Sequence, residues 1–170
     1  MSLQRLLPLI FRLIFVSLLA IGFAQVEIQI EGSAGWGASL PTWRIENHWL
    51  LDVFWGGRAM TGYHAWVFPW IALFFHWPLL HLKRPTWRDE AGVIAAIIQF
   101  WIIEDAMWFV MNPGFGWQAL NPAVAHWHKH WLWGLPVEYW GGSLVMLGLL
   151  WYNQRTALRS EEHTSELQSR

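Results

Sequence analysis

Four apolar runs, separated by polar connections, dominate the pattern of the chain. They cover residues 13–24, 63–82, 91–111 and 136–152. The last three fall within the range of about 17–25 mainly apolar residues that a helix needs to cross a bilayer. Pro113 cannot continue a helix and ends the third run, and Pro136 suits the first turn of the fourth. The pattern predicts an all-α integral membrane protein, a small bundle of four transmembrane helices.

The first run has two interpretations. Arg5 and Arg12 precede it, and small residues, Gly22 and Ala24, end it, which is typical of a secretory signal peptide over residues 1–24. An uncleaved anchor has the same pattern if Arg12 extends its side chain to the interface. Because further spans follow, we expect the anchor; cleavage would leave three spans.

Basic residues set the expected orientation. They gather before the first run, between the second and third, and after the fourth, at Arg5, Arg12, Lys83, Arg84, Arg88 and Arg155. The other connections, 25–62 and 112–135, hold few basic residues for their length. Since Lys and Arg are enriched on the cytoplasmic side, we expect both termini in the cytoplasm. The expected location is the inner (plasma) membrane of a bacterium.

The outer segment 25–62 is predicted to have little regular structure. Its stretch "VEIQIEG" alternates apolar and polar residues, which predicts a short strand, and the glycine-rich "GSAGWGAS" follows as a loop. The stretch "PTWRIENHWLLDVFW" predicts a short helix in the interface. We expect a single membrane domain over residues 1–158.

The end of the chain differs from the rest. The stretch "RSEEHTSELQS" is polar, follows an apolar helix abruptly and matches the in-frame translation of a common sequencing adapter. We therefore expect residues 159–170 to be adapter read-through, not native, with neither fold nor function.

Composition supports a membrane protein and excludes other classes. Only 14% of the 170 residues are charged, against about 25% in an ordinary soluble domain. The 16 Trp residues suit the interface, where the ring lies in lipid and its N–H reaches water. A net charge of -1 without a basic patch excludes a nucleic-acid binder, and the absence of Cys excludes a thiolate metal site. The lipid bilayer is the expected partner, and the oligomeric state stays open.

A histidine-rich stretch, "HWHKHW" at residues 126–131, lies in the second outer connection. Asn121 as N-cap and Gly134 just past the end predict a short interfacial helix. On such a helix His126 and His130, four positions apart, share a face. They are either the polar face of a helix that lies on the membrane or ligands of a metal ion.

Two adjacent carboxylates, Glu104 and Asp105, interrupt the third apolar run. A charge near the bilayer centre costs about 2.5–3.5 kcal/mol, so the pair must be compensated. On the predicted helix both fall within a stripe about 100° wide, together with Trp101, Trp108 and Asn112. We expect the pair to face the bundle interior, in the outer third of the bilayer and beneath the histidine stretch.

Further polar side chains are expected at the same level. His64 opens the second span, Glu138 opens the fourth, and Arg58 precedes the second. One interpretation is a structural network in which Arg58, Lys129 or a His neutralises a carboxylate, or in which burial keeps the carboxyl group protonated. His128 is a further candidate for the pocket. It is expected beside the Trp rings, where it would help to hold the interfacial helix at the lipid boundary.

A metal centre is the second interpretation. Its ligands would be Glu104, Asp105, His126 and His130, a mixed N/O set without sulfur that suits Zn, Fe or Mn. A third interpretation is proton or solute transfer along the carboxylates. Haem is not expected, because His76 has no second buried His at its depth.

The function classes follow from these interpretations. A metal site predicts a membrane hydrolase or oxidase that acts at the outer leaflet on a lipid-like or small apolar substrate. A structural network predicts a non-catalytic structural or assembly subunit, and transfer along the carboxylates predicts a proton or solute carrier. The chain has no phosphate-binding glycine loop, GxSxG elbow, HExxH pair or set of histidine boxes, so no particular substrate is indicated.

Overall fold

Long helices make up most of the computed structural model, which describes the backbone of residues 3–55 and 57–168 and the side chains of residues 6–53, 55 and 57–154. In chain order the elements are α1 (Leu3–Glu31), β1 (Arg44–Ile45), α2 (Trp49–Phe54), β2 (Met60–Thr61), α3 (Gly62–His76), the 3-10 helix η1 (Trp77–His81), α4 (Trp87–Met111), the 3-10 helix η2 (Trp117–Ala119), β3 (Trp131–Leu132), β4 (Leu135–Pro136) and α5 (Val137–Gln168). The strands pair as two antiparallel hairpins, β1 with β2 and β3 with β4.

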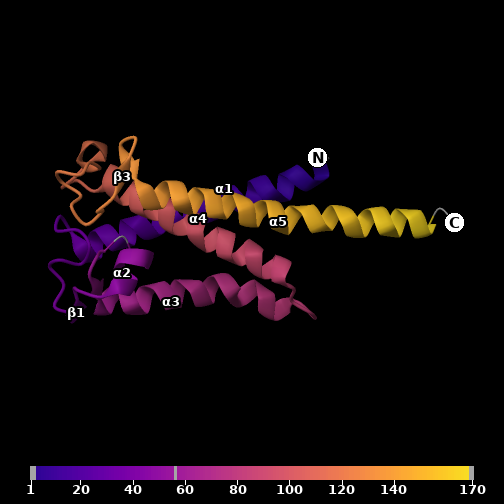
Figure 1. Ribbon diagram of the computed structural model, residues 1–170, viewed down its shortest axis with the longest axis horizontal. Helices are drawn as coiled ribbons and strands as arrows, with labels where there is room; N and C mark the ends of the chain where they lie inside the picture. Colours follow the sequence, from indigo (N-terminus) through magenta and orange to yellow (C-terminus); the bar gives the residue numbers. More distant parts are fainter. Residues whose placement is uncertain (1–2, 56, 169–170) are drawn as a thin grey trace.

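Helix α4 is the element against which the other long helices pack. It packs along α1 and α5 and less extensively against α3. Both termini and the turn from α3 to α4 lie at one end of the bundle, and the connections that carry the strands lie at the other (Figure 1). We call the first the terminal end, with residues 82–86, and the second the loop end, with residues 32–61 and 112–136.

Small residues let α1 and α4 approach closely. Ala20 and Ala24 of α1 and Ala95 of α4 are completely buried. A polar bond also joins the two helices, because Gln99 Nε2 donates to the carbonyl oxygen of Leu13 over 2.7 Å. Small buried residues and bonds between helices are the contacts that hold helices together within a bilayer.

Two helices are long and apolar enough to cross a membrane, judged by length and composition over the described residues. They are Leu6–Glu31, within α1, and Trp87–Met111, the whole of α4. The predicted second span is divided: α3 has 15 residues and continues as the five-residue η1, which has Pro78 in its first turn. The structure thus supports a helical protein with two membrane-length helices.

Two predicted helices are confirmed with shifted bounds. α4 ends at Met111, as expected, but begins at Trp87, where Thr86 and Asp89 form a capping box that starts the helix before the apolar run. The short helix expected in the outer segment is α2, and the ring nitrogen of His48 accepts a hydrogen bond from the Leu50 N–H at its start.

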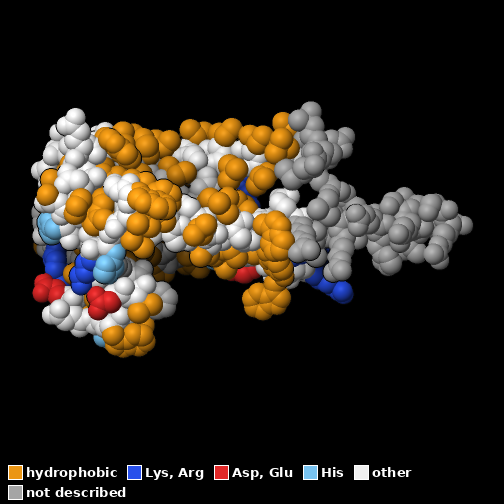
Figure 2. Space-filling view, turned by 45° about the horizontal axis from the view of Figure 1, so that its top comes forward, with side chains coloured by type: hydrophobic (Ala, Val, Ile, Leu, Met, Phe, Trp, Pro, Cys, Tyr) orange, Lys and Arg blue, Asp and Glu red, His pale blue; other side chains and the backbone are white. Residues whose placement is uncertain are grey.

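Large apolar side chains cover the outside of the bundle. Examples are Phe11 on α1, Trp66 on α3 and Leu144 on α5, which are 72%, 76% and 71% exposed. Apolar side chains spread along the helices on the face shown in Figure 2, whereas many of the charged and His side chains gather at the loop end. Soluble monomers rarely expose contiguous apolar patches of more than a few hundred Å², so this surface fits contact with lipid.

The strand predicted at "VEIQIEG" is wrong, because these residues form the last turns of α1. Val26 and Ile30 are partly exposed on the outside, whereas Glu27 and Glu31 are buried. A helix that has already formed extends without a second nucleation cost, and this outweighs a short alternation. As a consequence Glu27 and Glu31, four positions apart, lie on one helix face.

The interfacial helix predicted over residues 121–134 is also wrong. Asn121 caps a turn through its side chain, but no helix follows. Residues 131–136 form the β3–β4 hairpin, in which Trp133 and Gly134 have positive φ angles of 51° and 80°. Two-residue turns with positive φ at both positions suit the twist of antiparallel strands. Gly134 therefore forms a hairpin turn and does not end a helix.

Helix α5 extends beyond the predicted fourth span. Its backbone is helical from Val137 to Gln168, which differs from the tail without fold predicted for residues 159–170. The side chains from residue 155 onward lie outside the described residues. The origin of the tail as adapter read-through stays a prediction.

Candidate functional site

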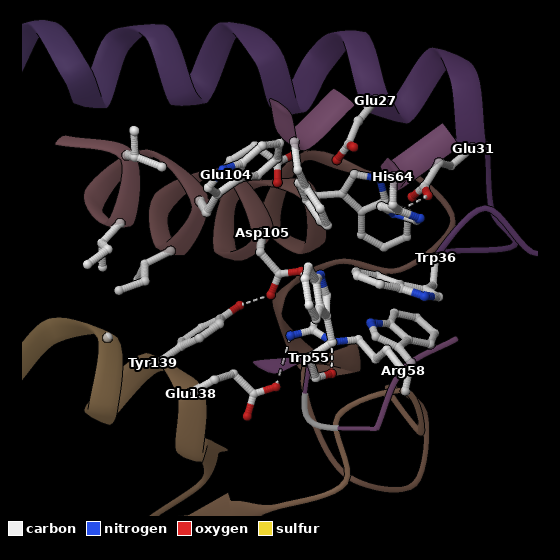
Figure 3. Close-up of a pocket in the computed structure, with 18 residues that line it drawn as sticks. Glu27, Glu31, Trp36, Trp55, Arg58, His64, Glu104, Asp105, Glu138 and Tyr139 are labelled. Atoms are coloured by element: carbon white, nitrogen blue, oxygen red, sulfur yellow. Dashed lines mark hydrogen bonds and ion pairs between the residues drawn. The ribbon is translucent and has the colours of Figure 1, made fainter. Parts of the chain in front are cut away.

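A cavity of about 410 Å³ lies at the loop end of the bundle. The ribbons of α1 and α4 run along one side of it, and α5 begins at the opposite side (Figure 3). Its polar lining consists of Glu27, Glu31, Arg58, His64, Glu104, Asp105, Glu138 and Tyr139. The remaining wall is aromatic and aliphatic, so the cavity combines an acidic part with an apolar part.

The acidic cluster of this cavity consists of Glu27, Glu31 and Glu104, which are 6%, 5% and 3% exposed. Tyr63 Oη donates to Glu27 Oε1 over 2.9 Å, and the carboxyl groups of Glu27 and Glu104 lie close enough to share a hydrogen bond. Because a carboxylate only accepts, the shared bond requires a proton on one of the two groups. The acidic cluster is therefore a place where the protein holds a proton.

His64 connects the acidic cluster to the loop that follows α1. Its Nδ1 lies 2.7 Å from Thr61 Oγ1, and its Nε2 lies 3.8 Å from Glu31 Oε1. The ring of Trp36 stacks on the imidazole at a centroid distance of 3.9 Å. These contacts hold the buried imidazole in one orientation, with Nε2 toward Glu31.

The paired cluster consists of Arg58, Asp105, His128, Glu138 and Tyr139. Arg58 Nη2 lies 3.1 Å from Glu138 Oε1, and its Nη1 lies 4.0 Å from Asp105 Oδ1. His128 approaches the same two carboxylates, with Nδ1 2.7 Å from Glu138 Oε1 and Nε2 3.3 Å from Asp105 Oδ2. Tyr139 Oη donates to Asp105. Each charged side chain of this cluster thus has an opposite charge within reach.

The protonation of His128 follows from these neighbours. Burial by itself lowers the pKa of the imidazole, but the carboxylates of Asp105 and Glu138 outweigh it, and the pKa of His128 is raised from its ordinary value. A protonated imidazole donates from both nitrogens, which suits a ring with a carboxylate on each side. The charged form of His128 is therefore favoured in the paired cluster.

Adjacent positions on α4 belong to the two different clusters. Successive residues of a helix point about 100° apart. Glu104 accordingly meets Glu27 of α1, whereas Asp105 meets Tyr139 of α5. Figure 3 shows Glu104 near α1 and Asp105 directed toward the side on which α5 begins. One pair of neighbouring carboxylates therefore serves two chemically different environments.

The loop after α1 has a strained backbone beside the cavity. Gly35, Trp36 and Gly37 have φ angles of 68°, 42° and 60°, a region that a bulky residue such as Trp rarely adopts. Trp36 is held there by its stack on His64, by a hydrogen bond from its ring N–H to a backbone carbonyl and by the Arg58 guanidinium, 4.4 Å from the ring centroid. Such strain, about 1–3 kcal/mol, tends to cluster at binding and active sites.

Three buried polar atoms of the cavity lining lack a hydrogen-bond partner: Glu31 Oε1, Glu104 Oε1 and Trp108 Nε1. An unpaired buried donor or acceptor costs about 1–3 kcal/mol, and the large majority of such atoms in folded proteins are paired. The other unpaired buried atoms of the described residues, on Arg88, Gln99 and His128, lie outside the cavity lining. Because the three atoms on Glu31, Glu104 and Trp108 line one cavity, a molecule bound there would satisfy them together. This convergence identifies the cavity as the candidate binding site.

Most of the predicted site residues lie at this cavity. Those that line it are His64, Arg58, Trp101, Glu104, Asp105, Trp108 and Glu138. Asn112 does not line it: its Nδ2 donates to Gly32 O over 2.8 Å and its Oδ1 accepts from Gly114 N over 2.9 Å. Asn112 therefore connects the end of α4 to the neighbouring loops.

The histidines of the stretch at residues 126–131 have roles that differ from the expected ones. His126 and His130 are exposed, and His126 Nδ1 lies 3.0 Å from the carbonyl oxygen of Val124. His128, which was expected at the lipid boundary, is 2% exposed and contacts Asp105 and Glu138. Since the segment is not helical, a spacing of four no longer places His126 and His130 on one face.

The residues predicted as metal ligands are not brought together. Among the described residues no three His, Asp or Glu side chains are grouped so that they could hold a metal ion. His126 and His130 are exposed, whereas Glu104 is buried. A Zn, Fe or Mn centre therefore stays a prediction. His76, considered for haem, bonds within the bundle, with Nε2 2.9 Å from Glu90 Oε1.

The sequence interpretation missed Glu27, Glu31, Trp36 and Tyr139. For Glu27 and Glu31 the available signal was their spacing of four, which places two carboxylates on one face if the segment is helical. The alternation of apolar and polar residues concealed it. No local pattern indicates Trp36, whose place depends on the folded loop and on His64.

Fold and site together define a mostly helical protein with two membrane-length helices and an acidic, aromatic-lined cavity. No protein-family model matches the chain, and neither the curated proteins nor the solved structures that were searched include a match.

Proposed function

We propose that the chain is a multi-pass membrane protein that binds a lipid-like or small apolar molecule in the cavity, at its outer side, and transfers protons to or from it. The cavity volume of about 410 Å³ falls within the range of about 300–1,000 Å³ typical of small-molecule sites. The observation that carries the proposal is the set of three unpaired polar atoms on Glu31, Glu104 and Trp108. A bound molecule supplies their partners.

Helix dimensions support four spans. The 15 residues of α3 rise about 1.5 Å each and the five of η1 about 2.0 Å each, together about 32 Å. This length matches the hydrocarbon core of about 30 Å. On α5, Leu144, Leu147 and Trp151 are exposed, as expected of a lipid-facing surface. Both termini lie at the same end as the turn from α3 to α4 (Figure 1), which is consistent with a common cytoplasmic side.

Reporter fusions test this placement. Fusions at Lys83 and at Gly116 should report the cytoplasm and the exterior, respectively, because residues 82–86 belong to the terminal end and residues 112–136 to the loop end (Figure 1). Identical signals from the two fusions would contradict the four-span arrangement.

Proton transfer is the chemistry that the side chains of the cavity offer. A hydrogen bond between Glu27 and Glu104 would hold a proton that a bound molecule can receive or displace. Asp105 and His128, 3.3 Å apart, form a second acid–base pair. Positioned carboxyl and imidazole groups contribute about 10²–10⁴-fold to rate through general acid–base catalysis. An acid–base enzyme therefore fits these residues better than a hydrolase or oxidase that depends on a metal.

The two other function classes explain less of the structure. A carrier needs a polar route through the bundle, but Phe23, Phe75, Phe100 and Trp101 pack together on the terminal-end side of the acidic cluster. A structural or assembly subunit has no need of unpaired buried atoms around a cavity. Ligand binding accounts for both the cavity and the unpaired atoms.

A photoreactive probe tests the binding proposal. A diazirine derivative of hexan-1-ol, applied to the purified protein in lipid nanodiscs, should label Ile98 and Ile102 in the cavity and Leu144 on the lipid-facing surface. Excess hexan-1-ol should suppress labelling in the cavity but not at Leu144, because only the cavity saturates. Labelling confined to Leu144, or labelling that no excess suppresses, would contradict the proposal.

Infrared spectroscopy tests the proton. The protein in nanodiscs should show a protonated carboxyl band that Glu104→Gln removes and that shifts when hexan-1-ol binds. Glu46→Gln is the matched control, because Glu46 is an exposed carboxylate of the outer segment. A band that persists in Glu104→Gln would place the proton elsewhere.

A further inference from the structure

We propose that the molecule bound in the cavity is a cationic amphiphile. Its ammonium group binds between Glu31 and Glu104, and its apolar part lies along α4 between α3 and α5. The inference rests on the proposed function, because it assigns a class of ligand to the same cavity. What it adds is selection for positive charge.

The two sides of the cavity differ in charge balance. In the paired cluster, Arg58 and His128 face the carboxylates of Asp105 and Glu138. In the acidic cluster, the described basic side chain that comes within 4.0 Å of a carboxylate oxygen is His64, whose Nε2 lies 3.8 Å from Glu31 Oε1. A carboxylate buried without a counter-ion is costly. A bound ammonium group supplies the positive charge that the acidic cluster lacks.

The unpaired atoms define the rest of the head group. Oε1 of Glu31 and Oε1 of Glu104 accept hydrogen bonds from an ammonium group, and Trp108 Nε1 donates to an acceptor. An ammonium group with a hydroxyl oxygen next to it therefore satisfies all three atoms. The three residues are 5%, 3% and 4% exposed, so bulk water competes little for these bonds.

Aromatic rings in the lining also favour a cation. Trp36, Trp55, Trp101 and Trp108 all line the cavity. The face of an indole ring attracts a cation within about 6 Å of its centroid, most strongly where water is excluded. The cavity already contains one contact of this kind, between Arg58 and Trp36 at 4.4 Å.

The apolar part of the cavity lies further toward the terminal end than the acidic cluster. Phe68 of α3, Ile98 and Ile102 of α4 and Gly142 of α5 line it. Gly142 brings α5 close to α4, since a Cβ atom there would lie 2.9 Å from Ile102 Cδ1. α3 and α5 both pack against α4, and over the described residues they have no extended contact with each other. A short alkyl chain fits in this space, with access from the outer leaflet between α3 and α5.

Binding of the cation is coupled to loss of a proton. Without a ligand, a hydrogen bond between the carboxyl groups of Glu27 and Glu104 needs a proton on one of them, because a carboxylate only accepts. When the ammonium group binds, it donates hydrogen bonds to the same carboxyl groups. Its positive charge then neutralises the carboxylate in place of the proton. That proton leaves to solvent, so one cation is exchanged for one proton.

Calorimetric titration of the protein in lipid nanodiscs tests the inference with four six-carbon probes, after subtraction of titrations into empty nanodiscs. Affinity should fall in the order 2-(hexylamino)ethanol, hexylamine, hexan-1-ol and hexanoate. In two buffers that differ in ionisation enthalpy, the amines should show proton release and hexan-1-ol should not.

Two conservative variants locate the ammonium group. Glu31→Gln and Glu104→Gln should each weaken binding of hexylamine by about ten- to one-hundred-fold, the effect of losing a hydrogen bond to a charged group. Hexan-1-ol should bind both variants as it binds the unmodified protein. Glu46→Gln, an exposed control, should leave the affinity of every probe unchanged. Melting curves of each variant check that it is folded.

The outcomes separate this inference from the proposed function. If hexan-1-ol or hexanoate binds as tightly as hexylamine, the inference is overturned and the proposed binding function stands. If none of the four probes binds saturably, both are overturned. If hexylamine binds the folded Glu31→Gln and Glu104→Gln variants without loss, the ammonium group is not held by these residues and the inference is again overturned. If the variants do not fold, the order of affinities of the four probes for the unmodified protein decides whether the inference stands.

Discussion

The paired cluster and the acidic cluster use the same residue types in different ways. In the paired cluster, Asp105 and Glu138 each have Arg58 and His128 within 4.0 Å. In the acidic cluster, Glu31 and Glu104 each keep an unpaired oxygen, whereas the atom of the paired cluster that lacks a hydrogen bond, His128 Nε2, still lies 3.3 Å from Asp105 Oδ2. The balanced cluster has little to gain from a ligand, whereas the unbalanced one leaves binding energy available. Charge balance, more than burial, therefore distinguishes a structural role from a binding role in this cavity.

Glu104 and Asp105 make the comparison direct. They carry the same functional group, occupy adjacent positions on α4 and belong to different clusters. If loss of charge lowers the stability of the protein at Asp105 but not at Glu104, this would support the distinction between a structural and a binding cluster. The free energy of unfolding of purified variants is the quantity to compare.

Asp105→Asn should have the largest effect. It removes the carboxylate charge that Arg58 and His128 share with Glu138, and it disturbs the hydrogen bond from Tyr139. Breaking a buried ion pair is strongly destabilising, and we expect a loss of about 3 kcal/mol in denaturant unfolding. Glu46→Gln is the control and should change stability by less than about 0.5 kcal/mol. A comparably small loss for Asp105→Asn would remove the basis for calling this cluster structural.

Gly35→Ala should have the next largest effect. Trp36, which follows it, touches both clusters through His64 and Arg58. Gly35 has a φ of 68°, and a Cβ atom there would lie 2.7 Å from Trp127 Cη2. Backbone strain and steric conflict together should cost about 2 kcal/mol.

Gly116→Ala is the matched control for this prediction. Its φ is 74°, but a Cβ atom would meet nothing within 4 Å, so only backbone strain of about 1 kcal/mol is expected. If the two variants lose the same free energy of unfolding in this experiment, the contact with Trp127 does not contribute to the loss.

The paired cluster should also make stability depend on pH. Because the folded state raises the pKa of His128, the imidazolium contributes stability that is fully present below the ordinary His pKa of about 6.5. This contribution is lost as the pH rises through the folded-state pKa. Unfolding measured across this range should show a decline that His128→Gln reduces and His126→Gln, at an exposed position, does not. The same decline in all three proteins would assign the dependence to other groups.

Glu104→Gln should have the smallest effect on stability, within about 1 kcal/mol of the unmodified protein. The variant removes a charge that has no cation beside it among the described residues, and an amide can still donate to Glu27. Stability is therefore expected to stay the same or to rise while binding of hexylamine falls. A loss as large as that of Asp105→Asn would mean that both clusters are structural.

Much of the fold was predictable because helices are encoded by local patterns. Apolar runs and Pro113 indicate α4 and its end at Met111, and the cost of charge in an apolar helix indicates that Glu104 and Asp105 face inward. The end of α1 was not predictable in this way, since "VEIQIEG" satisfies the pattern of a strand as well as that of a helix. Its state depends on the helix that precedes it.

Local patterns in the sequence were sufficient to predict an apolar helical bundle that carries Glu104 and Asp105 near one end, with His64, Arg58 and Glu138 close by. The entry of His128 into the paired cluster, in place of His126 or His130, was not predictable from local patterns and became clear only from the packed structure. The partners of His128 are two carboxylates from different helices. Asp105 of α4 is distant from His128 along the chain, and Glu138 of α5 follows it by ten residues. The physical reason is that hydrophobic periodicity and caps act over a few residues, whereas the partner that a buried charge requires is fixed only when separate helices pack together.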